Sequence, residues 1–159
     1  MKKIYIHFTR PHGFPSIYGM AIRIFDMCGY SHTAVEVGGI VYEADNKRTG
    51  PQPIEVFKKD NKLVYTEEVM LTETQYNLAE TYLKQQATKP YGWKTIWAIV
   101  FYRMTGIITF RDYEASFICS ELAIRVLWFC KYITKDKVIT DKPLEYYTPL
   151  NVRKVLRSL

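Results

Sequence analysis

The chain has 159 residues, of which 48% are apolar, and a formal net charge of +6. This length suits a single domain with its own core, and the composition excludes a disordered or low-complexity protein. The basic residues are scattered and accompany neither a zinc finger nor an aromatic ribonucleoprotein motif, so we expect no nucleic-acid partner.

The three cysteines, Cys28, Cys119 and Cys130, form no CxxC pair. This odd number argues against a disulfide framework and against a structural zinc site, and we expect neither a metal nor another cofactor. The basic N-terminus precedes an apolar run that is short and holds a histidine, which predicts a strand rather than a signal peptide. We therefore expect a reducing, cytoplasmic compartment and one domain over residues 1–159.

The first part of the chain predicts a strand, a loop, a helix and a hairpin, in that order. Residues 3–8 are rich in β-branched and aromatic side chains and predict the strand, and residues 9–15, with two prolines and a glycine, predict the loop. Ser16 can cap a helix that ends near Cys28. The β-rich runs 31–37 and 40–44 are joined by Gly38-Gly39, which is typical of a two-residue hairpin turn.

The second part begins with a polar loop over residues 45–53 and continues with strands over 54–57 and 63–70. Thr72 and Gln75 have the spacing of a capping box, which predicts a helix ending near Lys89. Further helices are expected over 93–105 and 117–132 and after Thr148-Pro149. Together these elements predict an α+β fold in which an antiparallel sheet packs against helices.

The apolar stretch from Trp93 to Phe110 just reaches the length of a membrane span. Lys94, Arg103 and Gly106 interrupt it, so we expect a buried or interfacial helix instead. A membrane-surface role is the alternative to core packing, because the stretch is aromatic and the chain is positively charged.

The predicted hairpin places a carboxylate near His32. If Gly38-Gly39 alone forms the turn, His32 lies opposite Asp45 and diagonal to Glu43, within side-chain reach. A turn of odd length would instead rotate both carboxylates to the other face. The residues themselves leave Glu43 and Asp45 open as partners of His32.

Cys119 opens an apolar helix, and the N-terminus of a helix stabilises a thiolate. In this interpretation His32 accepts the thiol proton and later donates it to the leaving group, while Glu43 or Asp45 orients the imidazole. The backbone N–H of Cys119 would stabilise the oxyanion. Such a site cleaves or transfers acyl groups without a metal. The alternative is that Cys119 is a small buried hydrophobe, as we expect of Cys28 and Cys130.

The chain order of Ser31-His32, Val41-Tyr42-Glu43-Ala44 and Cys119-Ser120-Glu121-Leu122 resembles the circularly permuted branch of the NlpC-type papain-like hydrolases. The YiiX-like proteins are the nearest resemblance, and lecithin–retinol acyltransferase-like enzymes are a more distant one. The resemblance implies a papain-like fold, with Cys119 as nucleophile, His32 as base and Glu43 rather than Asp45 as third residue.

The resemblance also has departures and secondary candidates. Gly92 of Pro90-Tyr91-Gly92 stands where the family often has aspartate, and the Asn-Cys-Glu-His run of the acyltransferase subgroup is absent. Ser31, Tyr91 and Ser120 are candidate substrate-binding residues beside the three catalytic candidates.

The sequence thus predicts a cysteine hydrolase of the amidase or peptidase type that acts on a peptide, amide or acyl-bearing substrate. One alternative is an acyltransferase or lipid hydrolase at a membrane surface. Another is a non-catalytic binding module on the same scaffold, because a fold does not fix a function.

Overall fold

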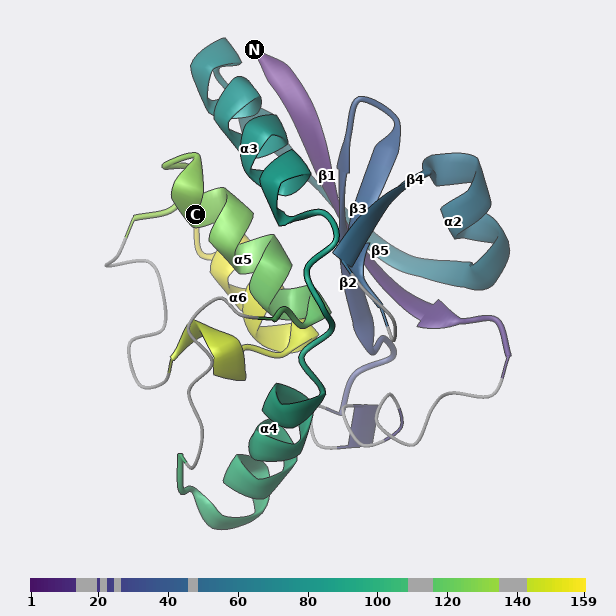
Figure 1. Cartoon of the computed structure of the whole chain (residues 1–159), viewed down its shortest axis with the longest axis vertical. Helices are drawn as coiled ribbons and strands as arrows, with labels where there is room; N and C mark the ends of the chain where they lie inside the picture. The colour runs from purple at the N-terminus through teal and green to yellow at the C-terminus, as the bar shows by residue number, and fades with distance from the viewer. Residues whose placement is uncertain (14–19, 21–22, 25–26, 46–48, 109–115, 135–142) are drawn as a thin grey trace.

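A computed structural model describes residues 1–13, 20, 23–24, 27–45, 49–108, 116–134 and 143–159. Its centre is a five-stranded antiparallel sheet in the order β4-β3-β2-β1-β5 (Figure 1). The strands are β1 (Lys2–Pro11), β2 (His32–Val37), β3 (Ile40–Ala44), β4 (Thr49–Pro53) and β5 (Asn61–Leu71). The described helices are α2 (Ile54–Asp60), α3 (Glu73–Gln86), α4 (Trp93–Thr105), α5 (Cys119–Phe129), the short η2 (Leu144–Tyr146) and α6 (Pro149–Arg157). The predicted α+β class is confirmed.

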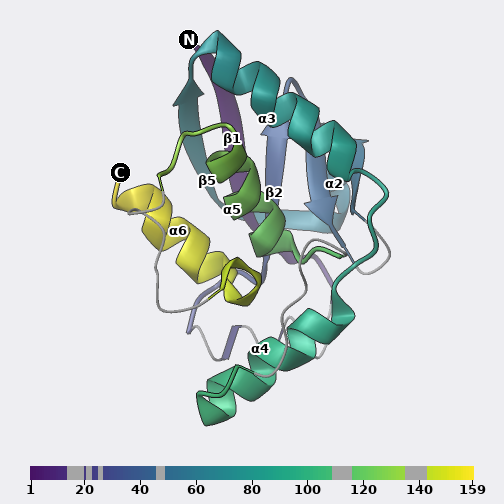
Figure 2. The ribbon, with the colours of Figure 1, turned by 60° about the vertical axis from the view of Figure 1, so that its left-hand side comes forward.

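The sheet is covered on both faces (Figures 1 and 2). On one face, alternate residues of β1, including Ile4, Ile6 and Phe8, join the main core with apolar residues of α3, α5 and α6. On the other face, Phe57 of α2 packs in a smaller cluster with Ala34 and Val41. Because successive side chains of a strand point to opposite faces of the sheet, alternate residues pack into two different cores. The larger of the two cores holds α5 against β2.

Helix α4 stands apart from these layers, at one end of the molecule (Figures 1 and 2). Its bounds agree with the predicted helix over 93–105. One side of it packs in a separate cluster with Ile118 and Tyr146, and the rings of Tyr102 and Tyr146 meet edge-on at 5.4 Å. Among the described helices, none is both long and apolar enough to cross a membrane.

The prediction of a loop over 45–53 is wrong for Thr49–Pro53, which forms β4. Pro51 and Pro53 are two residues apart, so both missing N–H donors lie on the same side of the strand. Because β4 is an edge strand of the sheet, that side needs no ladder partner. The loop predicted over 9–15 is likewise wrong at its start, since Thr9 to Pro11 continue β1 and pair with β5.

The strand predicted over 54–57 is wrong, because these residues begin α2. Glu55 lies in its first turn and Lys58 and Lys59 in its last, which complements the helix dipole. This arrangement, with Phe57 buried against the sheet, outweighs the β-propensity of Ile54 and Val56.

The remaining local predictions agree with the structure apart from a few terminal residues. The capping box of Thr72 and Gln75 is confirmed, and α3 ends at Gln86 rather than near Lys89. The helix predicted over 117–132 begins at Cys119 and ends at Phe129. The helix predicted over 16–28 lies largely outside the described residues.

Candidate active site

The hairpin of β2 and β3 has the register that the two-residue turn predicts. Val37 pairs with Ile40 and Val35 with Tyr42, and both turn glycines have positive φ, 59° at Gly38 and 80° at Gly39. Positive φ at both central residues is what a turn matching the strand twist requires. The register carries His32 and Glu43 to diagonal positions on one face.

The predicted contact between His32 and a carboxylate is confirmed for Glu43. Nε2 of His32 lies 2.6 Å from Oε2 of Glu43, and both side chains are largely buried. Asp45 follows the end of β3 and is exposed. The structure therefore assigns Glu43, and not Asp45, as the direct partner of the imidazole.

A third residue, Gln52 of β4, orients Glu43. Its side-chain amide donates a hydrogen bond to Oε1 of Glu43, so the two carboxylate oxygens bind different partners. No local signal points to Gln52, because its segment has the composition of a loop. Only the pairing of β4 with β3, which puts Gln52 diagonal to Glu43, reveals its position.

Cys119 is the first residue of α5 and is 3% exposed. Its thiol is hydrogen-bonded to the side chain of His32 and accepts from the backbone N–H groups of Thr33 and Ser120. Because Nε2 of His32 is engaged with Glu43, Nδ1 is the ring nitrogen left for the thiol. Cys119, His32, Glu43 and Gln52 thus form one continuous chain of contacts from three strands and a helix.

The electrostatics of these contacts favour a thiolate on Cys119 and an imidazolium on His32 over the two neutral side chains. Burial opposes the thiolate, but the imidazolium of His32 and the backbone donors outweigh it and lower the pKa of Cys119. Burial likewise opposes the imidazolium, yet the neighbouring Cys119 and Glu43 hold the pKa of His32 well above its usual value. Opposite shifts in two contacting groups are what a thiolate–imidazolium pair produces.

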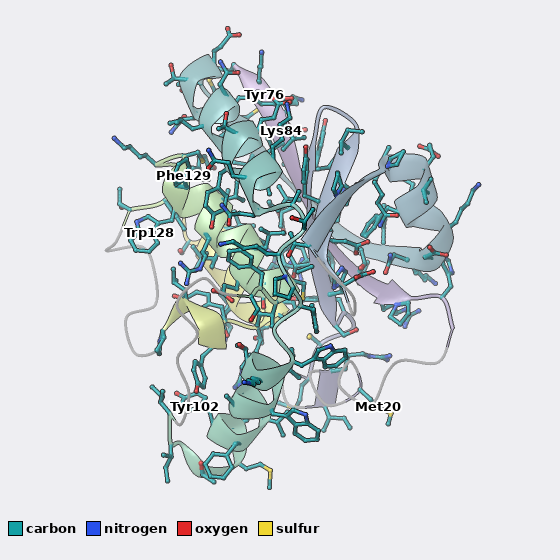
Figure 3. All side chains as sticks on the ribbon, viewed as in Figure 1. Met20, Tyr76, Lys84, Tyr102, Trp128 and Phe129 are labelled. Carbon is teal, nitrogen blue, oxygen red and sulfur yellow. The ribbon has the colours of Figure 1, made fainter. Side chains whose placement is uncertain are left out.

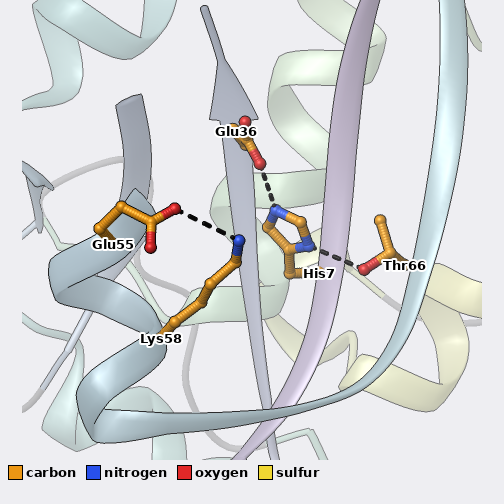
Figure 4. Close-up of polar contacts among 5 residues, drawn as sticks. All are labelled: His7, Glu36, Glu55, Lys58 and Thr66. Carbon is orange, nitrogen blue, oxygen red and sulfur yellow. Dashed lines mark hydrogen bonds and ion pairs between the residues drawn. The ribbon is translucent and has the colours of Figure 1, made fainter. Parts of the chain in front are cut away.

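A second histidine–glutamate pair on the same sheet allows the pKa of His32 to be compared with that of a histidine that has no cysteine partner. His7 of β1 lies between Glu36 and Thr66, with Nε2 2.7 Å from Oε2 of Glu36 and Nδ1 2.9 Å from Oγ1 of Thr66 (Figure 4). Burial dominates there and lowers the pKa of His7, despite the carboxylate. A glutamate partner alone therefore does not raise the pKa of a histidine on this sheet, since Lys58 opposes the imidazolium at His7 whereas Cys119 favours it at His32.

Tyr91, a predicted substrate-binding residue, lies next to this site. It forms a parallel backbone bridge with Phe117, and its ring meets that of Trp93 edge-on at 4.9 Å. Burial, Cys119 and Asp45 all raise the pKa of the Tyr91 hydroxyl, which places the tyrosine near both residues. Tyr91 thus borders the thiol from the segment that leads into α4.

The structure gives a steric reason for a glycine at position 92. A Cβ atom there would lie 3.2 Å from side-chain atoms of both Ile118 and Ser116. The backbone N–H of Gly92 donates to the carbonyl of Phe117 at 2.9 Å. A side chain at position 92 would therefore require Ile118, Ser116 or Thr95 to shift by a few tenths of an ångström.

The other two predicted substrate-binding residues have structural contacts. The hydroxyl of Ser120 is buried and donates to the carbonyl of Tyr147, which anchors the start of α5 to the C-terminal segment. Ser31 is buried, and its backbone N–H donates to the carbonyl of Thr9 at 2.9 Å. The side-chain bond of Ser120 favours a role in holding the start of α5, whereas substrate binding by Ser31 stays a prediction.

All three cysteines are free thiols. Cys28 donates to the carbonyl of Tyr30, and Cys130 is buried in the main core, where burial raises the pKa of its thiol. Within the described ranges, no group of three or more His, Cys, Asp or Glu side chains could hold a metal ion. Only Cys119 combines a helix start with a histidine partner.

A scan against protein-family models and a search of curated proteins found no match to this sequence. The chemistry of the site is therefore inferred from its geometry.

Proposed function

We propose that this protein is a cysteine hydrolase of the amidase or peptidase type. The observation that supports the proposal is the contact chain from Cys119 through His32 to Glu43, with the pKa values of Cys119 and His32 shifted in opposite directions. A thiolate at a helix N-terminus beside an imidazolium is the nucleophile that acyl-transfer chemistry needs.

In the acylation step, Sγ of Cys119 attacks the carbonyl carbon of an amide and forms a tetrahedral oxyanion. The backbone N–H of Cys119, at the start of α5, is positioned to donate to that oxyanion. His32 then gives its proton to the leaving amine as the C–N bond breaks, which leaves a thioester on Cys119 and a neutral imidazole.

In the deacylation step, neutral His32 accepts a proton from water, whose oxygen attacks the thioester carbonyl. The C–S bond breaks, a carboxylic acid leaves, and the thiolate–imidazolium pair is restored. Glu43, held by Gln52, keeps the ring oriented through both steps and stabilises the imidazolium. The sum is hydrolysis of one amide to an acid and an amine.

The proposal extends to a permuted papain-like fold and to a reducing, cytoplasmic compartment. In support of the fold, the histidine and the glutamate lie on neighbouring antiparallel strands and precede a cysteine at the start of a helix. In support of the compartment, the three cysteines are unpaired. The substrate class is a peptide, an amide or another acyl-bearing molecule.

The test is alkylation by iodoacetamide at pH about 6, where an ordinary thiol is mostly protonated. Mass spectrometry would map the label to Cys28, Cys119 or Cys130 in the wild type and in His32→Ala. Fast labelling of Cys119 alone, slowed by the His32 change, is the expected result. Turnover of any substrate found afterwards should vanish in Cys119→Ala while the melting temperature stays nearly the same.

A second candidate, a non-catalytic binding module, is favoured by one observation: only 3% of Cys119 is exposed. A substrate carbonyl has to reach Sγ through whatever opening the surrounding segments leave. If Cys119 reacts no faster than Cys28 and Cys130, the hydrolase proposal fails and the binding module replaces it.

A further inference from the structure

Helix α4 presents an exposed apolar stripe. Trp93, Trp97, Phe101 and Met104 are between 37% and 73% exposed. Their spacings of four, four and three residues put them on one face of the helix. The other face is already buried in the cluster around Tyr146. Soluble surface helices normally expose a polar face, so an apolar outer face indicates a partner.

The stripe lies on a helix at one end of the molecule (Figure 1). Helix α4 projects at one end of the molecule, away from the sheet (Figures 1 and 2). Met20, which is 48% exposed, lies at the same end (Figure 3). Ile107, directly after the helix and its Gly106 cap, is 57% exposed and continues the apolar surface.

The charged residues of the segment that forms the stripe are all basic. From Pro90 to Ile108 the chain has no acidic residue, whereas it has Lys94 and Arg103. On a helix with 3.6 residues per turn, Lys94 lies beside the stripe, whereas Arg103 lies farther round, toward the packed face of Ile96 and Ile99. An aromatic and aliphatic stripe with an exposed lysine at its side, on a chain of net charge +6, matches the anionic surface of a lipid bilayer, where long basic side chains reach the phosphates.

We propose that α4 docks on an anionic bilayer surface and lies parallel to it, with Trp93, Trp97, Phe101 and Met104 in the interfacial layer. A second copy of the chain fits this face less well. Pairing two such stripes would place the two Lys94 side chains at one interface, to which the segment from Pro90 to Ile108 contributes no carboxylate.

Docking would also fix the position of the candidate active site. The backbone N–H of Phe117 donates to the carbonyl of Pro90 at 3.1 Å, and Gly92 donates back to Phe117. These bonds tie the segment before α4 to the residues that lead into Cys119. Docking would therefore keep Cys119 near the bilayer, although docking itself does not depend on catalysis.

The first test uses the Trp128→Phe variant, which leaves Trp93 and Trp97 as its tryptophans. Phosphatidylcholine vesicles are prepared with and without phosphatidylglycerol. With phosphatidylglycerol at low salt, we expect a blue shift of the tryptophan emission and quenching by brominated lipid. High salt or the absence of phosphatidylglycerol should remove both signals. Unchanged emission with anionic vesicles at low salt would overturn the proposal.

The second test compares matched variants by co-sedimentation with the anionic vesicles. The double variant Trp97→Glu/Phe101→Glu should lower the partition coefficient by at least about tenfold. Val56→Glu, at a comparably exposed position on α2, should leave it unchanged, and thermal melts check that both variants fold. Cys119→Ala should bind like the wild type, so loss of activity and loss of docking are distinguishable.

Two results would contradict docking. One is an equal loss of binding in Val56→Glu, since the effect would then be one of net charge. The other is concentration-dependent self-association in analytical ultracentrifugation that Trp97→Glu/Phe101→Glu abolishes, which would make the stripe an interface between copies.

Discussion

Glu43→Gln tests whether the carboxylate behind His32 maintains the thiolate of Cys119. Glutamine has nearly the same shape and its carbonyl can still accept from Nε2, so the substitution removes the charge more than the contact. Glu43 raises the pKa of His32 in the folded protein. Without the carboxylate charge, the imidazolium is less stable and the thiol keeps its proton to a higher pH.

The expected change in the thiolate equilibrium of Cys119 follows from the contact between His32 and Glu43. The 2.6 Å bond joins two side chains that are 17% and 9% exposed, so solvent screens it little. A hydrogen bond to a charged group contributes about 1.5–3 kcal/mol, and we take the lower end because glutamine keeps an acceptor. Since about 1.4 kcal/mol is tenfold in an equilibrium constant, the ratio of the thiolate–imidazolium pair to the neutral pair should fall roughly tenfold.

The assay is the second-order rate constant for iodoacetamide labelling of Cys119, measured as a function of pH by mass spectrometry. In Glu43→Gln the acid side of the profile should move to higher pH. The matched control is Glu36→Gln, which changes the same type of contact at His7, away from Cys119. A Glu43→Gln profile that superimposes on the wild type, or one that Glu36→Gln reproduces, would refute the reasoning.

Two further predictions concern Gln52, which contacts Glu43, and His7, which contacts Glu36. Gln52→Leu removes the donor to Glu43, so labelling of Cys119 at pH about 6 should slow severalfold, while the melting temperature changes little because Gln52 is only half-buried. His7→Gln should reduce the acid sensitivity of folding. The pKa of His7 is lowered in the folded state, so its contribution to stability is present above pH about 6.5 and is lost as the pH falls from there through the folded pKa. Urea unfolding at pH about 7 and about 5 should therefore show a larger loss in the wild type than in the variant.

Local signals in the sequence predicted the parts of the fold that local interactions determine. The Gly38-Gly39 turn set the hairpin register, and with it the contact between His32 and Glu43. The Thr72 capping box set the start of α3. In both cases one or two residues select a backbone conformation largely independently of the rest of the chain.

The wrong predictions concern segments whose secondary structure depends on contacts with residues distant in the sequence. Strand β4 contains two prolines and is a strand only because it pairs with β3 at the edge of the sheet. Helix α2 has β-branched residues and is stabilised by packing Phe57 on the sheet. Gln52 was missed for the same reason, since its position beside Glu43 exists only once β4 is formed. The burial of Cys119 likewise depends on how α5 packs and has no local signal.

The two histidine–glutamate pairs show why residue type and spacing alone cannot identify the site. His7 and His32 each bind a glutamate across neighbouring strands at almost the same distance. At His7 the other ring nitrogen meets a threonine hydroxyl, and the nearby charge of Lys58 opposes protonation of the ring. At His32 the start of α5 brings a thiol to the ring instead. The sheet therefore provides two similar pairs, and the packing of one helix determines which of them contacts a thiol.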